Sequence, residues 1–334
     1  MGELKIANCK LKFVEAQPKS RPAAGEIGGE ETHPSLPSRE GMTTPVPPLL
    51  RGTAVEEPHP SPPSSSPQGG TSSCQQEGMT KRNIKMIVAY DGTCFHGWQR
   101  QRGQRTVQQE VETAISRVVC ERVALVAASR TDAGVHARGQ TAHFRTATII
   151  PCDRLLCGIN SSLPDSIAVM QLDDVAPEFS SRNATGKHYQ YRICRDVVDD
   201  PFSRRSRWRC VHALDISLMR EAARLMTGDV DFRGLQVKTG KDYETTIRTI
   251  WAIELQADDH ELVIDVYGKA FMYKQVRSMV GLLVAAGRGR AKIADIPALL
   301  SGTVEKRRSE VAPPQGLTLM KVYYGDQPPC GNKI

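Results

Sequence analysis

Residues 129–140 bring an arginine, an aspartate and a histidine together around two glycines. They follow the apolar stretch 123–127, and a strand that ends in a polar, glycine-containing loop is where α/β proteins tend to place functional side chains. Arg130 lies two residues before Asp132, and a nearby positive charge favours the ionised form of a carboxylate. In a pocket that excludes water, such a carboxylate can serve as a nucleophile or a base. Capping a helix or binding turn amides is the alternative role for a single aspartate.

Two other kinds of chemistry could use the same aspartate. Asp132, His136 and His143 offer the oxygen and nitrogen ligands that transition metals prefer. No cluster of acidic residues or cysteines supports such a site, and the flanking arginine would repel a cation, so we expect no metal. Glycosidase chemistry requires a second carboxylate. Asp231 and Asp265 are present, but nothing in the sequence connects either of them to Asp132.

Aromatic and basic residues that could bind nucleic acid occur in two further segments. Tyr189 and Tyr191 alternate with basic residues in 187–192, and an aromatic ring in such a strand can stack on a nucleobase. The simpler interpretation is that both tyrosines are half-buried residues of a sheet. Lys274 and Arg277 lie three residues apart in a predicted helix and are therefore expected to share one face. Each could form an ion pair in a cleft or simply extend its charge into water.

Charge is unevenly distributed along the 334 residues, whose net charge is +7. Seven Lys and Arg and nine Glu lie in residues 1–80, so the rest holds 37 of the 44 basic and 28 of the 37 acidic residues, an excess of nine. This excess favours a polyanionic partner such as nucleic acid. Residues 1–80 also hold twelve of the 21 prolines without a hydrophobic period, and we expect them to be disordered.

The cysteines and the apolar segments indicate a cytoplasmic protein. Nine cysteines occur without any CxxC pair, which indicates reduced thiols rather than a disulfide framework or a zinc ribbon. The longest apolar run, 279–287, is too short to cross a bilayer. We therefore expect no contact with a membrane.

Periodicity predicts an α+β chain with a repeated order of strand, helix, strand and strand. The predicted helices are one that begins at Thr106 with Gln109 in a capping box, then 153–159, 215–226 ending near Gly228, and 271–286. The predicted strands are 84–90, a strand leading into residue 130, 140–144, 167–172, 186–194, 246–256, 261–267 and 317–323. This order predicts two related lobes with antiparallel-rich mixed sheets flanked by helices.

Taken together, these segments resemble the TruA-type tRNA pseudouridine synthases over about residues 83–326. The run Arg-Thr-Asp-Ala-Gly-Val-His at 130–136 is the most specific part of the match. The other matching segments, in the same chain order as in the family, are 90–93, 97–99, 106–108, Asn160 with 163–164, 189–191, 248–249, Phe271 with 275–277, and 312–313 with 316–317.

The resemblance implies a cofactor-free isomerase that converts uridine to pseudouridine at positions 38, 39 and 40 of the tRNA anticodon arm. It implies a homodimer with the pseudouridine synthase fold and a basic cleft between two lobes, 81–182 and 183–326, followed by a flexible tail at 327–334. It also implies that Asp132 is the catalytic nucleophile and that Arg277 pairs with it. Tyr189 would stack on the target base, and Arg130 would help to hold the RNA.

Three segments depart from the usual family pattern. Ser129 replaces a glycine, 179–182 reads Phe-Ser-Ser-Arg, and 230–232 reads Val-Asp-Phe. These differences concern which uridines are modified rather than the chemistry. A non-catalytic RNA-binding protein or tRNA chaperone on the same scaffold is the alternative function, but binding a polyanion alone does not require the carboxylate of Asp132.

Overall fold

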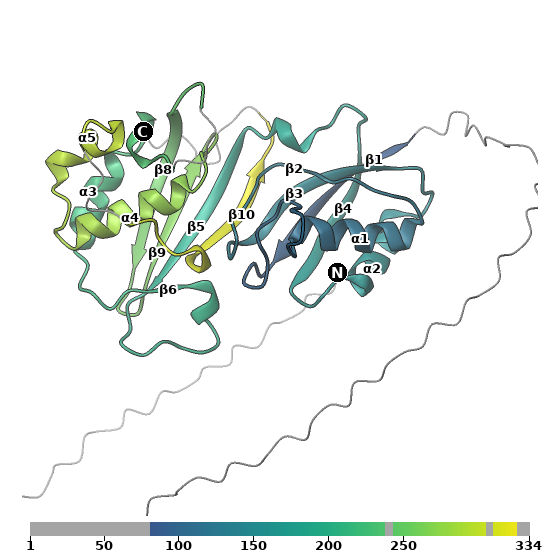
Figure 1. Ribbon diagram of the computed structural model, residues 1–334, viewed down its shortest axis with the longest axis horizontal. Helices are drawn as coiled ribbons and strands as arrows, with labels where there is room; N and C mark the ends of the chain where they lie inside the picture. The colour runs from purple at the N-terminus through teal and green to yellow at the C-terminus, as the bar shows by residue number, and fades with distance from the viewer. Residues whose placement is uncertain (1–80, 238–242, 305–309, 326–334) are drawn as a thin grey trace, which may run out of the picture. The chain divides into compact units, whose positions relative to one another are not determined.

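The computed structural model describes residues 81–237, 243–304 and 310–325 (Figure 1). Contacts divide the chain into residues 1–72 and 73–334, and all the described residues belong to the second unit. The segments 1–80 and 327–334, which we expect to be disordered and flexible, lie outside the described residues.

The described residues form one ten-stranded sheet in which most neighbouring strands are antiparallel. Its main path runs in the order β4-β1-β3-β10-β5-β9-β8-β7, while β2 pairs with β3 and β6 pairs with β5. The strands are β1 Arg82–Tyr90, β2 Val126–Ala127, β3 His136–Thr146, β4 Ile167–Val175, β5 Gly186–Cys194, β6 Trp208–Arg209, β7 Gly228–Asp231, β8 Ile247–Ala257, β9 Glu261–Gly268 and β10 Leu317–Tyr323. The predicted antiparallel-rich α+β architecture is therefore confirmed.

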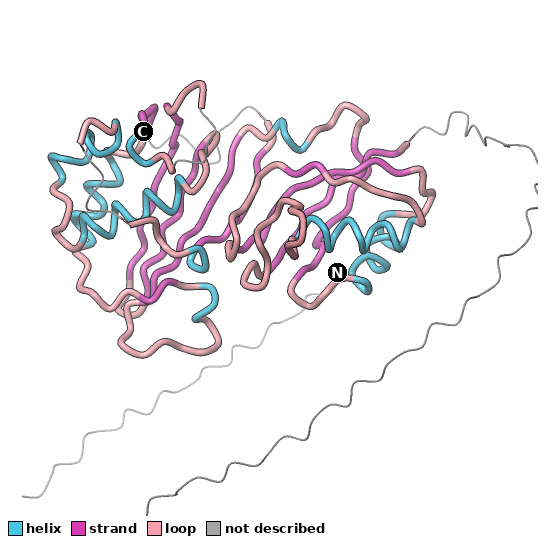
Figure 2. Tube along the Cα trace, viewed as in Figure 1, coloured by secondary structure: helices cyan, strands magenta, loops and turns pink. Residues whose placement is uncertain are grey.

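The last strand joins the two halves of this sheet. β10 pairs in parallel with β3, from the first half, and antiparallel with β5, from the second. Figure 2 shows the strands as one layer that continues across both groups of helices. The two parts of the chain thus share a single sheet, and the loops at their junction come close together.

Helices accompany each half of the sheet (Figure 1). In that view α1 and α2 lie beside β1, β3 and β4, whereas α3, α4 and α5 lie beside the strands of the second half. The helices are α1 Val107–Val119, α2 Cys152–Ser162, α3 Ile216–Arg224, α4 Gln275–Gly287 and α5 Ile296–Ser301, and five short 3₁₀ turns complete the described part. Every residue of α4 is buried, including the polar side chains of Gln275, Arg277 and Ser278. The other residues of the helix are apolar or glycine, as expected for a helix that is covered on all sides. Among the described residues, no helix is long and apolar enough to span a membrane.

One predicted helix start is wrong, and the predicted side-chain cap of another helix does not form. The segment 271–286 becomes helical only at Gln275, because Lys274 adopts a left-handed backbone with φ of 57° and precedes the first turn. Lys274 therefore does not share a helix face with Arg277. Thr106 does precede α1, but its side chain makes no capping hydrogen bond, and its buried hydroxyl oxygen has no partner among the described residues.

Three other boundaries also differ from the predictions. The strand leading towards residue 130 is only the two residues of β2, and β3 begins at His136 rather than at residue 140. The helix predicted to extend to residue 226 ends at Arg224, and Gly228 begins β7 instead of capping that helix. The strands predicted at 246–256 and 261–267 are confirmed as the antiparallel pair of β8 and β9.

Candidate functional site

The loop between β2 and β3 contains a tight turn, Arg130–Val135, which we call the aspartate turn. The amide of Val135 donates to the carbonyl of Asp132 (3.2 Å), and the amide of Trp98 donates to the carbonyl of Thr131 (3.1 Å). Gly97 has a φ of 85°, and a Cβ added there would lie 2.5 Å from the Thr131 carbonyl oxygen. Only glycine allows this close approach at that conformation. The 97–98 backbone therefore fixes the position from which Asp132 projects.

The structure brings Asp132 and Arg277 together across 145 residues of sequence. An Arg277 Nη1 group donates to Asp132 Oδ2 at 2.9 Å, and the two side chains are 10% and 15% exposed. Arg277 is itself fixed by Ala312, because its Nε donates to the Ala312 carbonyl (2.8 Å) and the Ala312 amide donates to the Arg277 carbonyl (3.1 Å). Asp132 Oδ1 has no hydrogen-bond partner among the described residues. One carboxylate oxygen is thus oriented by a cation while the other remains available.

Tyr189 lies on β5 with its side chain almost fully buried. Its hydroxyl shares a hydrogen bond of 2.8 Å with Ser129 Oγ, and its ring meets Phe271 edge to face with centroids 5.3 Å apart. Burial raises the pKa of Tyr189 to about 12, so it remains a neutral phenol at physiological pH. Ser129, one of the departures from the family pattern, therefore contacts the tyrosine that the resemblance singles out.

A cavity of about 680 Å³ lies between these groups and is bounded by both halves of the sheet. All four predicted site residues, Arg130, Asp132, Tyr189 and Arg277, line it. Asp132 is the one acidic residue among the described lining residues, whereas Arg130, Lys187, Lys274 and Arg277 are basic. The cavity therefore combines a single carboxylate with a strongly positive wall, which suits a polyanionic ligand that reacts at one point.

Arg130 differs from the other three predicted residues because it is exposed. It lines the cavity, yet no hydrogen bond or ion pair joins its side chain to the part of the chain that the structure describes. A guanidinium at the rim of a pocket, without an internal acceptor, is free to bind a phosphate.

Several cavity residues were not site candidates in the sequence analysis, among them Lys187, Phe271, Tyr243 and Tyr273. Lys187 could have been found, because strand residues two apart project to the same face and Tyr189 was already a candidate. Tyr243 precedes β8, Tyr273 follows β9, and the Tyr273 amide donates a hydrogen bond to the Tyr243 hydroxyl (3.0 Å). No sequence signal indicates that contact.

The other groups considered for chemistry are occupied elsewhere. His136 Nδ1 accepts from the Gly92 amide (3.1 Å), and His143 is bound to Ser181, so each histidine has its own partner. Across the residues that the structure describes, no group of three or more His, Cys, Asp or Glu could hold a metal ion. Asp231 and Asp265 do not line the cavity. Among the described residues, no second carboxylate lines the cavity beside Asp132.

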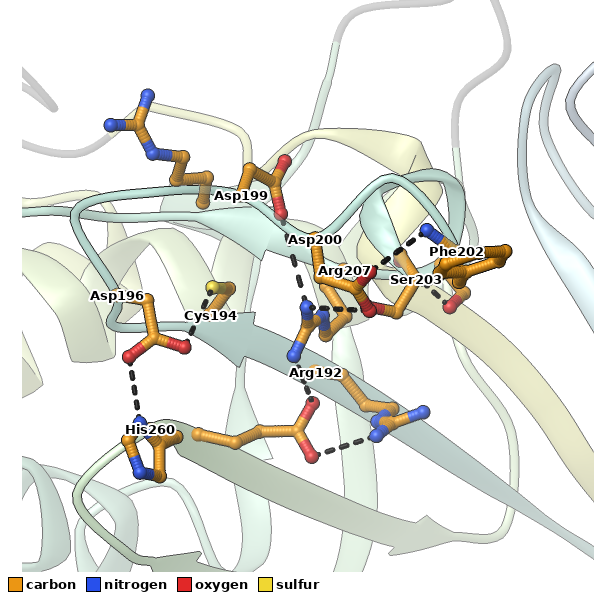
Figure 3. Close-up of polar contacts among 12 residues, drawn as sticks. Arg192, Cys194, Asp196, Asp199, Asp200, Phe202, Ser203, Arg207 and His260 are labelled. Carbon is orange, nitrogen blue, oxygen red and sulfur yellow. Dashed lines mark hydrogen bonds and ion pairs between the residues drawn. The ribbon is translucent and has the colours of Figure 1, made fainter.

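A second polar cluster lies at the start of β9 and in the loop that follows β5 (Figure 3). The guanidinium of Arg207, 11% exposed, lies 3.8 to 4.0 Å from the carboxylates of Asp199, Asp200 and Glu261. Arg192 pairs with Glu261 at 2.7 Å. None of these residues lines the cavity. We interpret this network as support for the 195–207 loop rather than as a second reaction centre.

Comparisons with known proteins identify the same segments. A family model described as tRNA pseudouridine synthase matches residues 86–182 and 222–325, which include the aspartate turn and Arg277. A protein named tRNA pseudouridine synthase A from Acetivibrio thermocellus is 38% identical over 244 residues, or 73% of this chain and 100% of that protein. The protein of the same name from Geobacter sulfurreducens is 42% identical over 244 residues, with the same coverage. A solved archaeal box H/ACA ribonucleoprotein complex gives a TM-score of only 0.27 at 14% identity, over 60% of this chain and 44% of the matched one.

Proposed function

Because this chain belongs to the family of tRNA pseudouridine synthases, we propose that it isomerises uridine to pseudouridine in tRNA, at positions 38, 39 and 40 of the anticodon arm. The observation that carries the proposal is the Asp132–Arg277 ion pair, which forms part of the wall of a basic cavity. A carboxylate is costly at the centre of a site that binds a polyanion, and the proposed reaction gives a reason for it to be there.

The proposed reaction begins when the target uridine leaves the base stack. Within a stem the glycosidic bond is inaccessible, so the base must be extruded into the cavity at a cost of a few kcal/mol. The ring of Tyr189 offers a stacking surface that returns about 1–3 kcal/mol of this cost. Arg130, at the rim, is placed to bind the backbone of the extruded nucleotide.

Asp132 then acts as the nucleophile, and Arg277 holds the attacking carboxylate in position. As the carboxylate attacks the nucleoside, the bond between N1 of uracil and the ribose breaks. The detached uracil rotates and rejoins the ribose through C5, and the bond that the Asp132 carboxylate formed with the nucleoside breaks. The C5 proton is lost while N1 gains a proton, so the carboxylate is regenerated. The product has the same atoms as the substrate, so this isomerisation requires no oxidant, reductant or phosphate donor.

The proposal also includes a homodimer that acts in the cytoplasm on tRNA. Both of these points rest on the family resemblance and on the reduced-thiol composition of the chain. Light scattering on the purified protein tests the first point, since a dimer has twice the mass of the chain. A monomeric mass in the presence and absence of tRNA would contradict it.

The central experiment incubates an anticodon-arm transcript with the purified protein and measures pseudouridine by mass spectrometry. Asp132→Ala should abolish the product while RNA binding persists, because removing a negative charge does not weaken attraction to phosphate. Asp153→Ala is the matched control, since that aspartate lies on α2 with its side chain 78% exposed. Product formation by Asp132→Ala would exclude Asp132 as the nucleophile. RNA binding without product formation by the wild type would favour the alternative function of a tRNA chaperone. Added chelator should leave the rate unchanged.

A further inference from the structure

Lys187 lies in the cavity wall but has no role in the proposed chemistry. It is the second residue of β5, paired with Gly268 of β9 on one side and Val322 of β10 on the other. Tyr189 follows two residues later on the same face of the strand, about 7 Å further along. Both residues line the cavity that contains Asp132. Lys187 is therefore next to the surface on which the extruded base would stack.

The part of the chain that the structure describes supplies no counter-ion to this lysine. No hydrogen bond or ion pair joins its ammonium group to any residue in the described ranges. Asp132 is the one acid among the described cavity-lining residues, and its interaction with Arg277 is already in place. Burial lowers the pKa of Lys187 below its usual value, as expected for a cation removed from water without a compensating charge. An uncompensated ammonium in a cavity wall is unfavourable unless a ligand supplies the missing negative charge.

We propose that Lys187 binds a backbone phosphate of the RNA at the nucleotide that enters the cavity. The assignment rests on the proposed tRNA substrate. A lysine ammonium is a compact point charge that suits a phosphate, whereas a neutral uracil carbonyl would leave the charge uncompensated. The base and its own phosphate belong to one nucleotide, so two side chains on the same face of β5, two residues apart, can hold both. Tyr189 contacts the base, and Lys187 contacts the phosphate.

Neutralising one phosphate has a measurable signature in the salt dependence of binding. Each phosphate contact releases condensed counter-ions, and the slope of log K against log salt concentration changes by about 0.7 to 0.9 per contact. Lys187→Met removes the charge but keeps an unbranched chain of similar length. It should make the slope shallower by that amount and weaken binding at low salt roughly 10- to 100-fold. Lys187→Arg keeps the charge and should retain the slope of the wild type.

Lys321 provides a matched control on the neighbouring strand. It pairs with His188 in the register of β10 and β5, is exposed, and does not line the cavity. Lys321→Met removes the same charge from the same sheet and should leave the slope of the wild type unchanged. The rate of product formation gives a second distinction. Loss of a contact that is made equally before and during the reaction raises KM and leaves kcat unchanged, so Lys187→Met should reach the wild-type kcat at saturating RNA.

The experiment measures the affinity of the full chain for an anticodon-arm transcript at four or more salt concentrations, together with pseudouridine formation. Lys187→Gln serves as a second neutral variant, and thermal unfolding monitors the fold of each protein. A slope for both neutral variants equal to that of the wild type would overturn the phosphate assignment. An equal loss of RNA affinity in Lys187→Arg and Lys187→Met would also overturn it, because it would indicate that the lysine has a structural role. If the slopes of the wild type and Lys187→Met differ as expected while the wild type forms no pseudouridine, the proposed function fails and the phosphate contact stands.

Discussion

Replacing either partner of the Asp132–Arg277 ion pair should lower the free energy of unfolding, but by unequal amounts. Asp132→Asn leaves the guanidinium of Arg277 with its hydrogen bond to the Ala312 carbonyl. Arg277→Met removes that hydrogen bond as well and leaves a carboxylate, 15% exposed, without its cation. We therefore expect Arg277→Met to be the more destabilising substitution, by about 1 kcal/mol for the additional hydrogen bond.

The size of the interaction follows from its geometry. Two unit charges about 4 Å apart attract by roughly 4 kcal/mol at the effective dielectric constant typical of such pairs. Desolvation of both groups offsets much of this attraction. Removing one partner of a buried pair nevertheless costs about 3–5 kcal/mol, because the other charge is left buried without compensation. Asp132 adjoins the cavity and regains water when its partner is removed, so we expect about 2–3 kcal/mol for Arg277→Met. The double variant should be about 1–3 kcal/mol more stable than the sum of the single losses predicts.

Urea denaturation of the wild type, both single variants and the double variant gives this coupling energy directly. The measurement does not depend on RNA, so it tests the geometry of the pair separately from the proposed reaction. Losses that add to within about 0.5 kcal/mol would refute the reasoning, because they would mean that the two side chains act independently. An Asp132→Asn variant less stable than Arg277→Met would refute the role assigned to Ala312.

Three other perturbations test separate parts of the structure. Gly97→Ala should lower the free energy of unfolding by at least about 1 kcal/mol more than Gly103→Ala, since both glycines have positive φ but only Gly97 closely contacts other backbone. His143 has a pKa lowered by burial and then by nearby arginines, and its Nδ1 accepts from the Ser181 amide (3.2 Å). Because the unfolded chain binds this proton more readily, acidification from pH 8 to pH 5 should destabilise the wild type more than His143→Asn, by about one hydrogen bond or 1 kcal/mol. Tyr189→Phe keeps the stacking ring and should form product within about tenfold of the wild-type rate.

Each of these predictions has an outcome that contradicts it. Equal losses in the two glycine variants, measured by urea denaturation, would remove the argument for close contact at Gly97. Parallel pH profiles of stability for the wild type and His143→Asn would mean that this histidine is not the group that titrates. Complete loss of pseudouridine in Tyr189→Phe would transfer the role of Tyr189 from its ring to its hydroxyl.

Apart from β2 and β3, local patterns predicted the bounds of the predicted strands more accurately than the start of α4. The strand predicted at 317–323 coincides with β10, because its alternating apolar residues pack against one face of the sheet. The start of α4 was missed because the side chain of Gln275 folds back and accepts from the Met272 amide (2.8 Å), while Lys274 takes a left-handed conformation. Neither feature changes the apolar period, so periodicity extended the helix by a full turn.

The arrangement of the candidate site depends on contacts that no local pattern encodes. The sequence offered Asp132 and Arg277 as separate charged residues, and only the family resemblance paired them. Their juxtaposition depends on how the sheet brings its two halves together. The Arg207 cluster in Figure 3 likewise joins residues from the loop after β5 and from β9, and no motif predicted it. Composition, in contrast, did indicate the basic lining of the cavity.

The central position of β10 has a consequence for how the protein is made. The ribosome releases β3 and β5 long before Leu317–Tyr323, yet that strand lies between them in the finished sheet. Ala312, which holds Arg277, emerges only just before it. A nascent chain that ends between residues 277 and 312 therefore contains Asp132, Tyr189 and Arg277 but has neither Ala312, which supports the arginine, nor the strand that joins the two halves. Activity should thus appear only when synthesis is nearly complete, and prematurely terminated chains should be inert.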